Sequence, residues 1–290
     1  MGRSYVALTL ACCWIAAAPI LIRASEVDPA TSLWLRMLIA VAVLASIRGP
    51  RLHSFSSERV LLLAASIAFA IDILAYHLAV VRTSVANTAV LGQISPLVVA
   101  PISYLVLGER QSLGSVAGLF GAFAGAVLLA GTGESSSYIG NGLAALSGVS
   151  YAAYLLIAKS VATRIAPRRM ILWNCVVTVL LATPLALQRG TPILPHTTQG
   201  WLVILAMALG CQLLGHGLVV YAIERLPASF TAQALLTPPV LSTGAALLLF
   251  QERPSLGQLS GAALVLVGLL LAARHEARRP ATSYPASTLA

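Results

Sequence analysis

Ten separate apolar runs divide this sequence, and each is long enough to cross a lipid bilayer as a helix. A helix needs roughly 17 to 25 residues to span a hydrocarbon core of about 30 Å. The runs occupy about residues 5–22, 30–47, 60–81, 84–107, 113–131, 139–158, 170–187, 200–222, 229–250 and 256–273. The first run could be read as a signal peptide, but nine further spans favour an uncleaved helix. The pattern predicts an all-α integral membrane protein with ten transmembrane helices.

The composition excludes several other classes of protein. With 58% hydrophobic and 9% charged residues, a water-soluble fold would expose very large apolar patches. The net charge of +9 does not indicate nucleic-acid binding, because the basic residues lie singly between apolar runs. The four cysteines lie within apolar runs without metal-ligand spacing, so we expect no disulfide, metal site or cofactor. The lipid bilayer is the expected solvent.

The distribution of lysine and arginine predicts the orientation, since short cytoplasmic loops retain positive charge. If the N-terminus is inside, Arg36 lies within a span and four arginines lie outside. The thirteen remaining basic residues lie inside: Arg3, Arg48, Arg51, Arg59, Arg110, Lys159, Arg164, Arg168, Arg169, Arg225, Arg274, Arg278 and Arg279. The sequence therefore predicts a multi-pass protein of a bacterial cytoplasmic (inner) membrane with both termini cytoplasmic.

A constant offset of 143 residues superimposes the two halves of the chain. It pairs Glu109-Arg110 with Glu252-Arg253, and it also pairs Arg82 with Arg225, Pro96 with Pro239, Gly118 with Gly261 and Gly125 with Gly268. Five spans is an odd number, so the second copy enters the membrane from the opposite side. The prediction is two inverted five-helix repeats, 1–137 and 138–274, with a disordered cytoplasmic tail at 275–290. Inverted repeats are characteristic of transporters, in which one site opens alternately to each side.

The paired hairpins also carry a family resemblance. Pro96 to Leu107 is followed by Gly108-Glu109-Arg110, and Pro239 to Phe250 by Gln251-Glu252-Arg253. Together with the glycine-rich helices after them, these segments resemble the EamA-like family of the drug/metabolite transporter superfamily. The resemblance implies a ten-helix bundle whose central cavity is lined by spans one to four and six to nine. It implies export of amino acids or other small metabolites, although some members take solutes up.

Polar residues within the spans are the candidates for a substrate and proton pathway, because burying them in lipid is costly. They are Trp14, Arg36, Asp72, Tyr76, His77, Asn87, Gln93, Tyr151, Tyr154, Gln212, His216 and Gln233. Asp72 lies near the middle of its span, and two interpretations of it stay open. In the functional interpretation, Asp72 is a carboxylate that couples protons or binds an amino group of the substrate. In the structural interpretation, Asp72 forms an ion pair with Arg36 that joins spans two and three. Gln212 and His216 are spaced i, i+4 and would present one polar stripe.

Two further features predict structural roles. Glu109, Arg110, Glu252 and Arg253 lie at tight turns near the membrane surface, where we expect them to clamp hairpins. The helices after these turns carry small-residue faces that permit close helix packing. These faces are Gly114, Gly118, Gly121 and Gly125, with Gly257 and Gly261 in the second half. Whether they pack internally or join the protomers of a homodimer stays open.

The functional prediction is a secondary transporter that moves a small metabolite, amino-acid-like or drug-like, across the inner membrane. Export with proton coupling by alternating access is favoured, and an uptake permease of the same fold is the alternative. A non-transporting receptor or assembly subunit would leave the inverted repeat without a use. No metalloprotease helix, nucleophile elbow or phosphate loop occurs, so the sequence predicts no enzyme and no nucleotide-driven transport.

Overall fold

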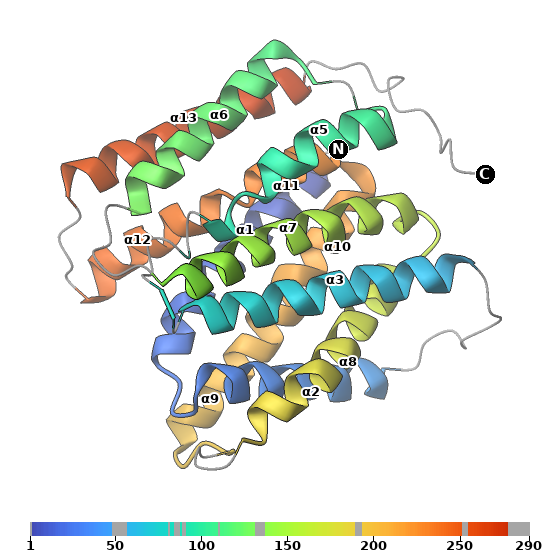
Figure 1. Ribbon diagram of the computed structural model, residues 1–290, viewed down its shortest axis with the longest axis vertical. Coiled ribbons are helices and arrows are strands. Elements are labelled where there is room, and N and C mark those ends of the chain that lie inside the picture. The colour runs from blue at the N-terminus through green and yellow to red at the C-terminus, as the bar shows by residue number, and fades with distance from the viewer. Residues whose placement is uncertain are drawn as a thin grey trace.

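The computed structural model describes residues 2–47, 57–80, 82–83, 88, 91–109, 111–130, 137–188, 193–250 and 255–277, and these ranges are helical throughout apart from short connections. The first half contributes α1 (Gly2–Arg23), α2 (Pro29–Ser46), α3 (Ser57–Val80), α5 (Ser95–Leu107) and α6 (Leu113–Ala130). The second half contributes α7 (Tyr138–Val161), α8 (Pro167–Ala186), α9 (Thr198–Ala206), the π-helix η1 (Met207–His216), α10 (Gly217–Arg225), α11 (Ala228–Ala234), α12 (Thr237–Phe250) and α13 (Leu256–Ala277). Figure 1 shows them as one all-helical bundle.

The described helices make ten membrane segments, as predicted. Six are long and apolar enough to cross a bilayer, among them the continuous rod Thr198–Arg225 formed by α9, η1 and α10. The predicted span 229–250 is broken between α11 and α12. The break has a local cause, because Pro238 and Pro239 lie in the first turn of α12 and cannot donate backbone hydrogen bonds to a preceding helix. Pro96 likewise begins α5, so these prolines start helices rather than interrupt them.

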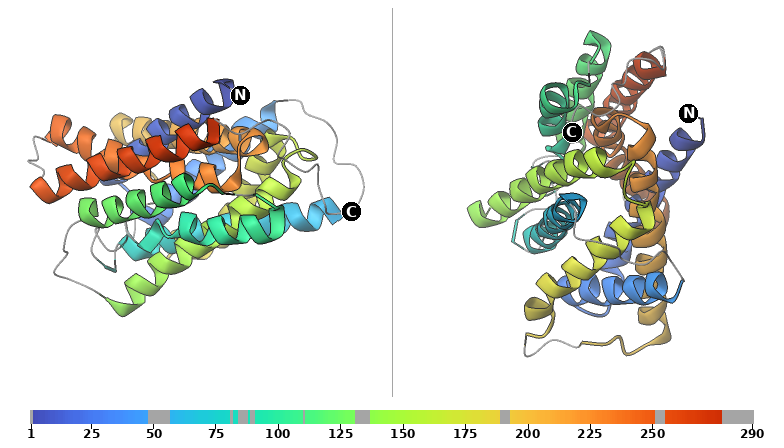
Figure 2. Two further views of the ribbon diagram at one scale, coloured as in Figure 1. Left: turned by 90° about the horizontal axis from the view of Figure 1, so that it is seen from above. Right: turned by 90° about the vertical axis from the view of Figure 1, so that its right-hand side faces the viewer.

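The packing of the helices follows the repeat. α3 of the first half packs against α7 of the second. The equivalent of α3 in the second half is the rod Thr198–Arg225, and it packs against α1, the equivalent of α7. α5 packs against α7 in the same way as α12 packs against α1, while α2 packs against α8. Each contact between the halves therefore has a mate in which the two copies exchange roles. Two views at right angles show the helices of the two halves interleaved rather than side by side (Figure 2).

The pair α6 and α13 shows that the repeat is inverted. A Cβ atom built on Gly118 would lie 2.5 Å from the carbonyl oxygen of Gly268, and one on Gly125 would lie 2.6 Å from that of Gly261. The offset of 143 makes Gly118 equivalent to Gly261 and Gly125 equivalent to Gly268. Exchanging the two halves therefore turns each contact into the other, as in an isologous interface. The order of the contacts also shows that α6 and α13 run antiparallel. Gly118, Gly125 and Gly261 therefore pack internally, whereas a Cβ atom on Gly121 or Gly257 would meet no other helix within 4 Å.

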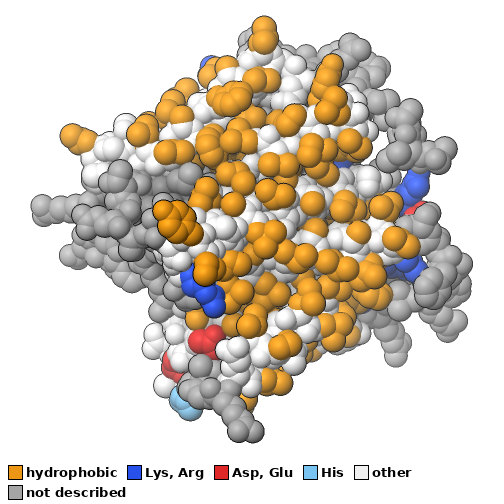
Figure 3. All heavy atoms as spheres, in the orientation of Figure 1, with side chains coloured by type: hydrophobic (Ala, Val, Ile, Leu, Met, Phe, Trp, Pro, Cys, Tyr) orange, Lys and Arg blue, Asp and Glu red, His pale blue; other side chains and the backbone are white. Residues whose placement is uncertain are grey.

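The outer surface is apolar over most of the face seen in Figure 3, with charged side chains mainly toward its edges. Large hydrophobic side chains are exposed there and elsewhere, including Leu113 at 90%, Leu256 at 86% and Leu105 at 77%. Such exposure is unfavourable in water but suits a surface that faces lipid.

Substituting Gly118 tests the close packing of α6 and α13. We expect Gly118→Ala to lower the free energy of unfolding by about 1–3 kcal/mol, because the added methyl group meets backbone rather than a flexible side chain. Thermal unfolding of the purified protein in detergent measures the change. Gly121→Ala on the same helix is the matched control, since nothing lies within 4 Å of its added methyl group. Equal stability of the two variants would contradict the packing role.

Candidate functional site

Several buried or half-buried polar side chains lie on the helices that pack between the two halves. α2 and α3 supply them from the first half, and α7, α8 and η1 supply them from the second. They form two groups. We name these the Asp72 cluster (Asp72, Tyr76, Ser147, Tyr151 and Tyr154) and the Arg36 cluster (Arg36, His77, Gln212 and His216).

The Asp72 cluster joins α3 to α7. The Asp72 carboxylate accepts a hydrogen bond of 2.6 Å from the Ser147 hydroxyl. The Tyr76 ring and the Ser147 hydroxyl both lie beside Gly92, 3.5 and 4.0 Å from a Cβ atom built on it. The Tyr151 and Tyr154 rings follow Ser147 on α7, with centroids 5.7 Å apart. The Tyr151 hydroxyl is buried without a hydrogen-bond partner. Asp72 is thus held by the second half through a single neutral donor.

Asp72 and Arg36 do not form an ion pair. The salt bridge that the structural interpretation of Asp72 requires is therefore absent from the described residues. Both residues are described, and neither makes a salt bridge within the described chain. The residue that α3 and α7 use instead, Ser147, was not predicted. A single serine in an apolar helix gives little signal in a sequence, because most such hydroxyls bond to their own backbone.

A buried hydrogen-bond chain lies next to this cluster. Asn174 of α8 donates to the Tyr154 hydroxyl at 3.1 Å and accepts from the Ser66 hydroxyl at 3.0 Å. The Phe69 ring packs edge-on against Tyr154 and against His216, with centroids 5.1 and 5.0 Å apart. Tyr154 is thereby fixed in position, with its hydroxyl satisfied, while the neighbouring Tyr151 hydroxyl stays unpaired.

The Arg36 cluster lies among α2, α3, α8 and η1. Arg36 is 4% exposed, makes no hydrogen bond within the described residues, and its Nε atom is buried without a partner there. The elements that carry His77 and His216, α3 and η1, both pack against α2. The His77 Nδ1 atom lies 2.6 Å from the Ile73 carbonyl oxygen, which can only accept, so Nδ1 donates.

Three more polar atoms of this cluster lack partners. They are His77 Nε2, His216 Nδ1 and Gln212 Oε1, and all are buried. Gln212 and His216 lie on η1, so the predicted polar stripe is on a π-helix, a form that occurs frequently at functional sites. Unpaired buried polar groups are costly unless something pairs with them.

The remaining predicted residues lie apart from the two clusters or outside the described residues. Trp14 is 39% exposed and packs on η1, where a Cβ atom on Gly210 would lie 2.4 Å from its ring. Gln233 is buried in α11 with neither amide atom paired, and Gln93 is partly buried at a helix end. Asn87, Arg110, Glu252 and Arg253 lie outside the described residues.

Glu109 binds the start of a helix in the opposite half. Its carboxylate, 5% exposed as a residue, accepts hydrogen bonds from the backbone N–H groups of Ala228 and Ser229 at 2.8 and 3.2 Å. The Ser229 hydroxyl donates a third bond at 3.1 Å. α11 starts after Pro227, which offers no side-chain cap, so Glu109 supplies the negative charge that a helix N-terminus favours.

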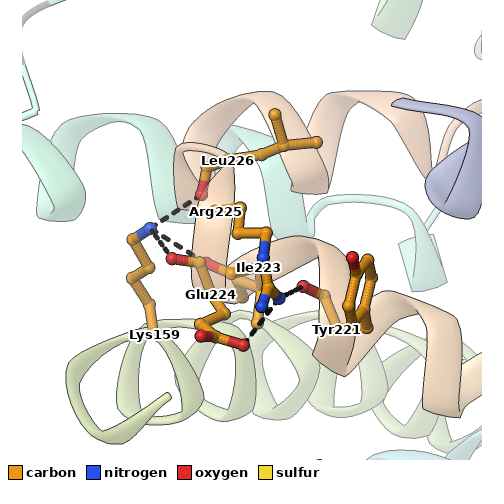
Figure 4. Close-up of polar contacts among 6 residues, drawn as sticks. All are labelled: Lys159, Tyr221, Ile223, Glu224, Arg225 and Leu226. Carbon is orange, nitrogen blue, oxygen red and sulfur yellow. Dashed lines mark hydrogen bonds and ion pairs between the residues drawn. The ribbon is translucent and has the colours of Figure 1, made fainter. Parts of the chain in front are cut away.

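Lys159 binds the preceding helix end at the same corner (Figure 4). Its ammonium group donates to the carbonyl oxygens of Ile223 and Leu226 at 2.9 and 2.8 Å, and more weakly to that of Glu224. These carbonyls end α10 and have no intrahelical partners. A cation at a helix C-terminus and an anion at the next N-terminus together fix the α10–α11 corner.

Glu26 makes a similar contact at the other end of the rod Thr198–Arg225. Its carboxylate accepts from the backbone N–H groups of His196 and Thr197 at 2.8 and 3.1 Å, and from the Thr197 hydroxyl. The Thr197 hydroxyl in turn caps α9 by accepting from Gly200. Carboxylates of the first half therefore bind second-half backbone at both ends of the molecule.

Removing the Glu109 carboxylate leaves buried backbone donors unpaired. We expect Glu109→Ala to lower the free energy of unfolding by about 2–4 kcal/mol, with Glu109→Gln intermediate because one acceptor oxygen remains. Glu224→Ala is the matched control, since it removes only a solvent-exposed ion pair worth about 0–1 kcal/mol. Thermal unfolding in detergent compares the three. A Glu109→Ala protein as stable as Glu224→Ala would refute the capping role.

Acid should weaken the Glu26 contact. The Thr197 hydroxyl, helped by the backbone N–H groups of His196 and Thr197, lowers the pKa of Glu26 below its ordinary value of 4.5. The ionised carboxylate therefore stabilises the fold above about pH 4.5, and this contribution disappears as the pH falls through the lower folded-state pKa. The unfolding midpoints of the native protein and Glu26→Gln should differ at pH 7 and converge below pH 4. A gap that stays constant to pH 3 would contradict this assignment.

Comparison with known proteins supplies the family. Residues 3–131 and 138–274 each match the EamA-like transporter family. The chain is similar to another protein whose crystal structure is solved, with 19% sequence identity and a TM-score of 0.80. The match covers 96% of this chain and 99% of that one. No curated protein sequence matches the chain. The two family matches cover nearly the whole sequence, and the chain therefore belongs to the EamA-like transporter family, a family of membrane transporters and not of enzymes.

Proposed function

We propose that this chain is a proton-coupled secondary transporter that exports a small, amino-acid-like or drug-like metabolite by alternating access. The repeats 1–137 and 138–274 are the two bodies that rock against each other. The substrate and proton pathway passes between them, along the Asp72 and Arg36 clusters. The predicted tail at 275–290 lies outside the described residues beyond Ala277, where α13 ends.

One observation carries the proton link. Asp72 lies at the boundary between the halves, half-buried, and within the described residues its one hydrogen bond is that from Ser147 of the opposite half. A carboxylate without a cationic partner at such depth gains stability by taking up a proton. Rocking of the halves would change the Ser147 contact and the access of water, so proton uptake and release would follow the transport cycle.

The orientation rests on the loop charges. With both termini cytoplasmic, thirteen of the 18 basic residues lie on the cytoplasmic side. The corner held by Glu109 and Lys159 then faces the cytoplasm, and Glu26 faces the outside of a bacterial inner membrane. Export is the favoured direction. An uptake permease would use the same site, and the direction of substrate flux along a proton gradient distinguishes the two.

Neutralising Asp72 should remove the coupling. We would reconstitute the protein in liposomes that enclose a pH-sensitive dye and screen amino acids and small metabolites for proton movement. A substrate that drives proton flux in the native protein is expected to drive at least tenfold less in Asp72→Asn, because Asn cannot carry the proton. The same substrate, given as a radiolabelled compound, reports flux independently of protons.

Glu224→Gln is the matched control, since its carboxylate pairs with Arg225 at an exposed helix end and should leave the flux unchanged. Native rates and native pH dependence in Asp72→Asn would show that Asp72 carries no coupling proton. Substrate flux without any proton movement in the native protein would replace the antiport mechanism by facilitated diffusion through the same site.

A further inference from the structure

Arg36 is a buried arginine without a counter-ion. The residue is 4% exposed, and no hydrogen bond or ion pair to it exists within the described chain. Arg36 cannot escape the cost of burial by losing its proton, because a guanidinium stays charged in proteins. A structural arginine in a helical bundle normally donates to backbone carbonyls or carboxylates, and Arg36 does neither. Its fork of donors is therefore available.

The surroundings of Arg36 are uncharged or positively charged. His77 of α3, Cys175 of α8, and Cys211 and His216 of η1 lie on elements that pack against α2. Arg36 makes no ion pair with a carboxylate within the described chain, and Asp72 is bonded to Ser147 in the other cluster. Nothing described near Arg36 neutralises it.

The ring nitrogens beside Arg36 are also unpaired. His77 Nε2 and His216 Nδ1 are both buried without partners, one from α3 of the first half and the other from η1 of the second. The two imidazoles lie on α3 and η1, and both elements pack against α2, which carries Arg36. These unpaired groups lie on the boundary between the halves, where the proposed transport pathway runs.

We propose that the Arg36 cluster binds an anionic group of the transported substrate, and that this group is a carboxylate. The planar guanidinium donates two parallel hydrogen bonds to the two oxygens of a carboxylate, a match that a lysine or a single histidine does not provide. His216 can add a donor through its unpaired Nδ1, whereas the His77 ring already donates through Nδ1 to the Ile73 carbonyl oxygen. The inference rests on the proposed transport function and specifies one part of the substrate.

Binding can be measured without transport. Acetate, benzoate and L-leucine are each paired with the primary amide of the same acid, and the thermal unfolding midpoint of the purified protein in detergent is followed against concentration. A ligand that binds the folded state raises the midpoint. We expect at least one carboxylate to do so and its amide not. Its dissociation constant should rise about ten- to hundredfold in Arg36→Gln and by less in Arg36→Lys, which keeps the charge.

Arg82→Gln is the matched control, because Arg82 is exposed at the end of α3 and bonds only a backbone carbonyl. The proposal fails if no carboxylate stabilises the native protein, if the amides stabilise it equally, or if Arg36→Gln binds as the native protein does. Equal stabilisation of the native and Arg36→Gln proteins by sodium chloride marks a non-specific salt effect. If liposome flux persists while these binding tests fail, the transport function stands and only the carboxylate assignment falls.

Discussion

The satisfaction of helix ends by charged side chains is the interaction on which the rest of this structure depends. Each helix leaves backbone donors and acceptors unpaired at its termini, and those buried within the protein need a partner other than water. Here Glu109 of the first half binds the start of α11, and Lys159 binds the end of α10. These contacts fix a sharp corner between two helices and hold one half against the other.

The scaffold is symmetric, but the polar chemistry inside it is not. The offset of 143 places Gly215 opposite Asp72, and Val179 opposite Arg36. Lys159 falls opposite Ala16. The glycines of α6 and α13, by contrast, keep their partners in both copies. Packing is thus duplicated, while Asp72, Arg36 and Lys159 each occur in one copy only, so the transport site belongs to the whole chain rather than to either repeat.

The fold was largely predictable from the sequence, because length and hydropathy define membrane spans strongly and a repeated hairpin identifies the second copy. The family assignment followed from the same hairpins and is confirmed. The break between α11 and α12 was missed, since an apolar run does not reveal where Pro238 and Pro239 end the preceding helix. The candidate site was harder. The sequence marked Asp72 and Arg36 by their rarity in lipid but could not tell whether they meet, because that depends on helix rotation. The π-helix around Gln212 likewise has no sequence period of its own.

The glycine contacts between α6 and α13 have a genetic consequence. In a dimer of identical five-helix chains, one codon would supply both members of an equivalent pair, and two codons would provide all four glycines. In this fused chain Gly118, Gly125, Gly261 and Gly268 are encoded separately, so each is exposed to mutation on its own. The same separation allows one copy to change without the other. A single chain can therefore hold Asp72 and Arg36 in one half and the residues that face them in the other, an arrangement closed to a homodimer.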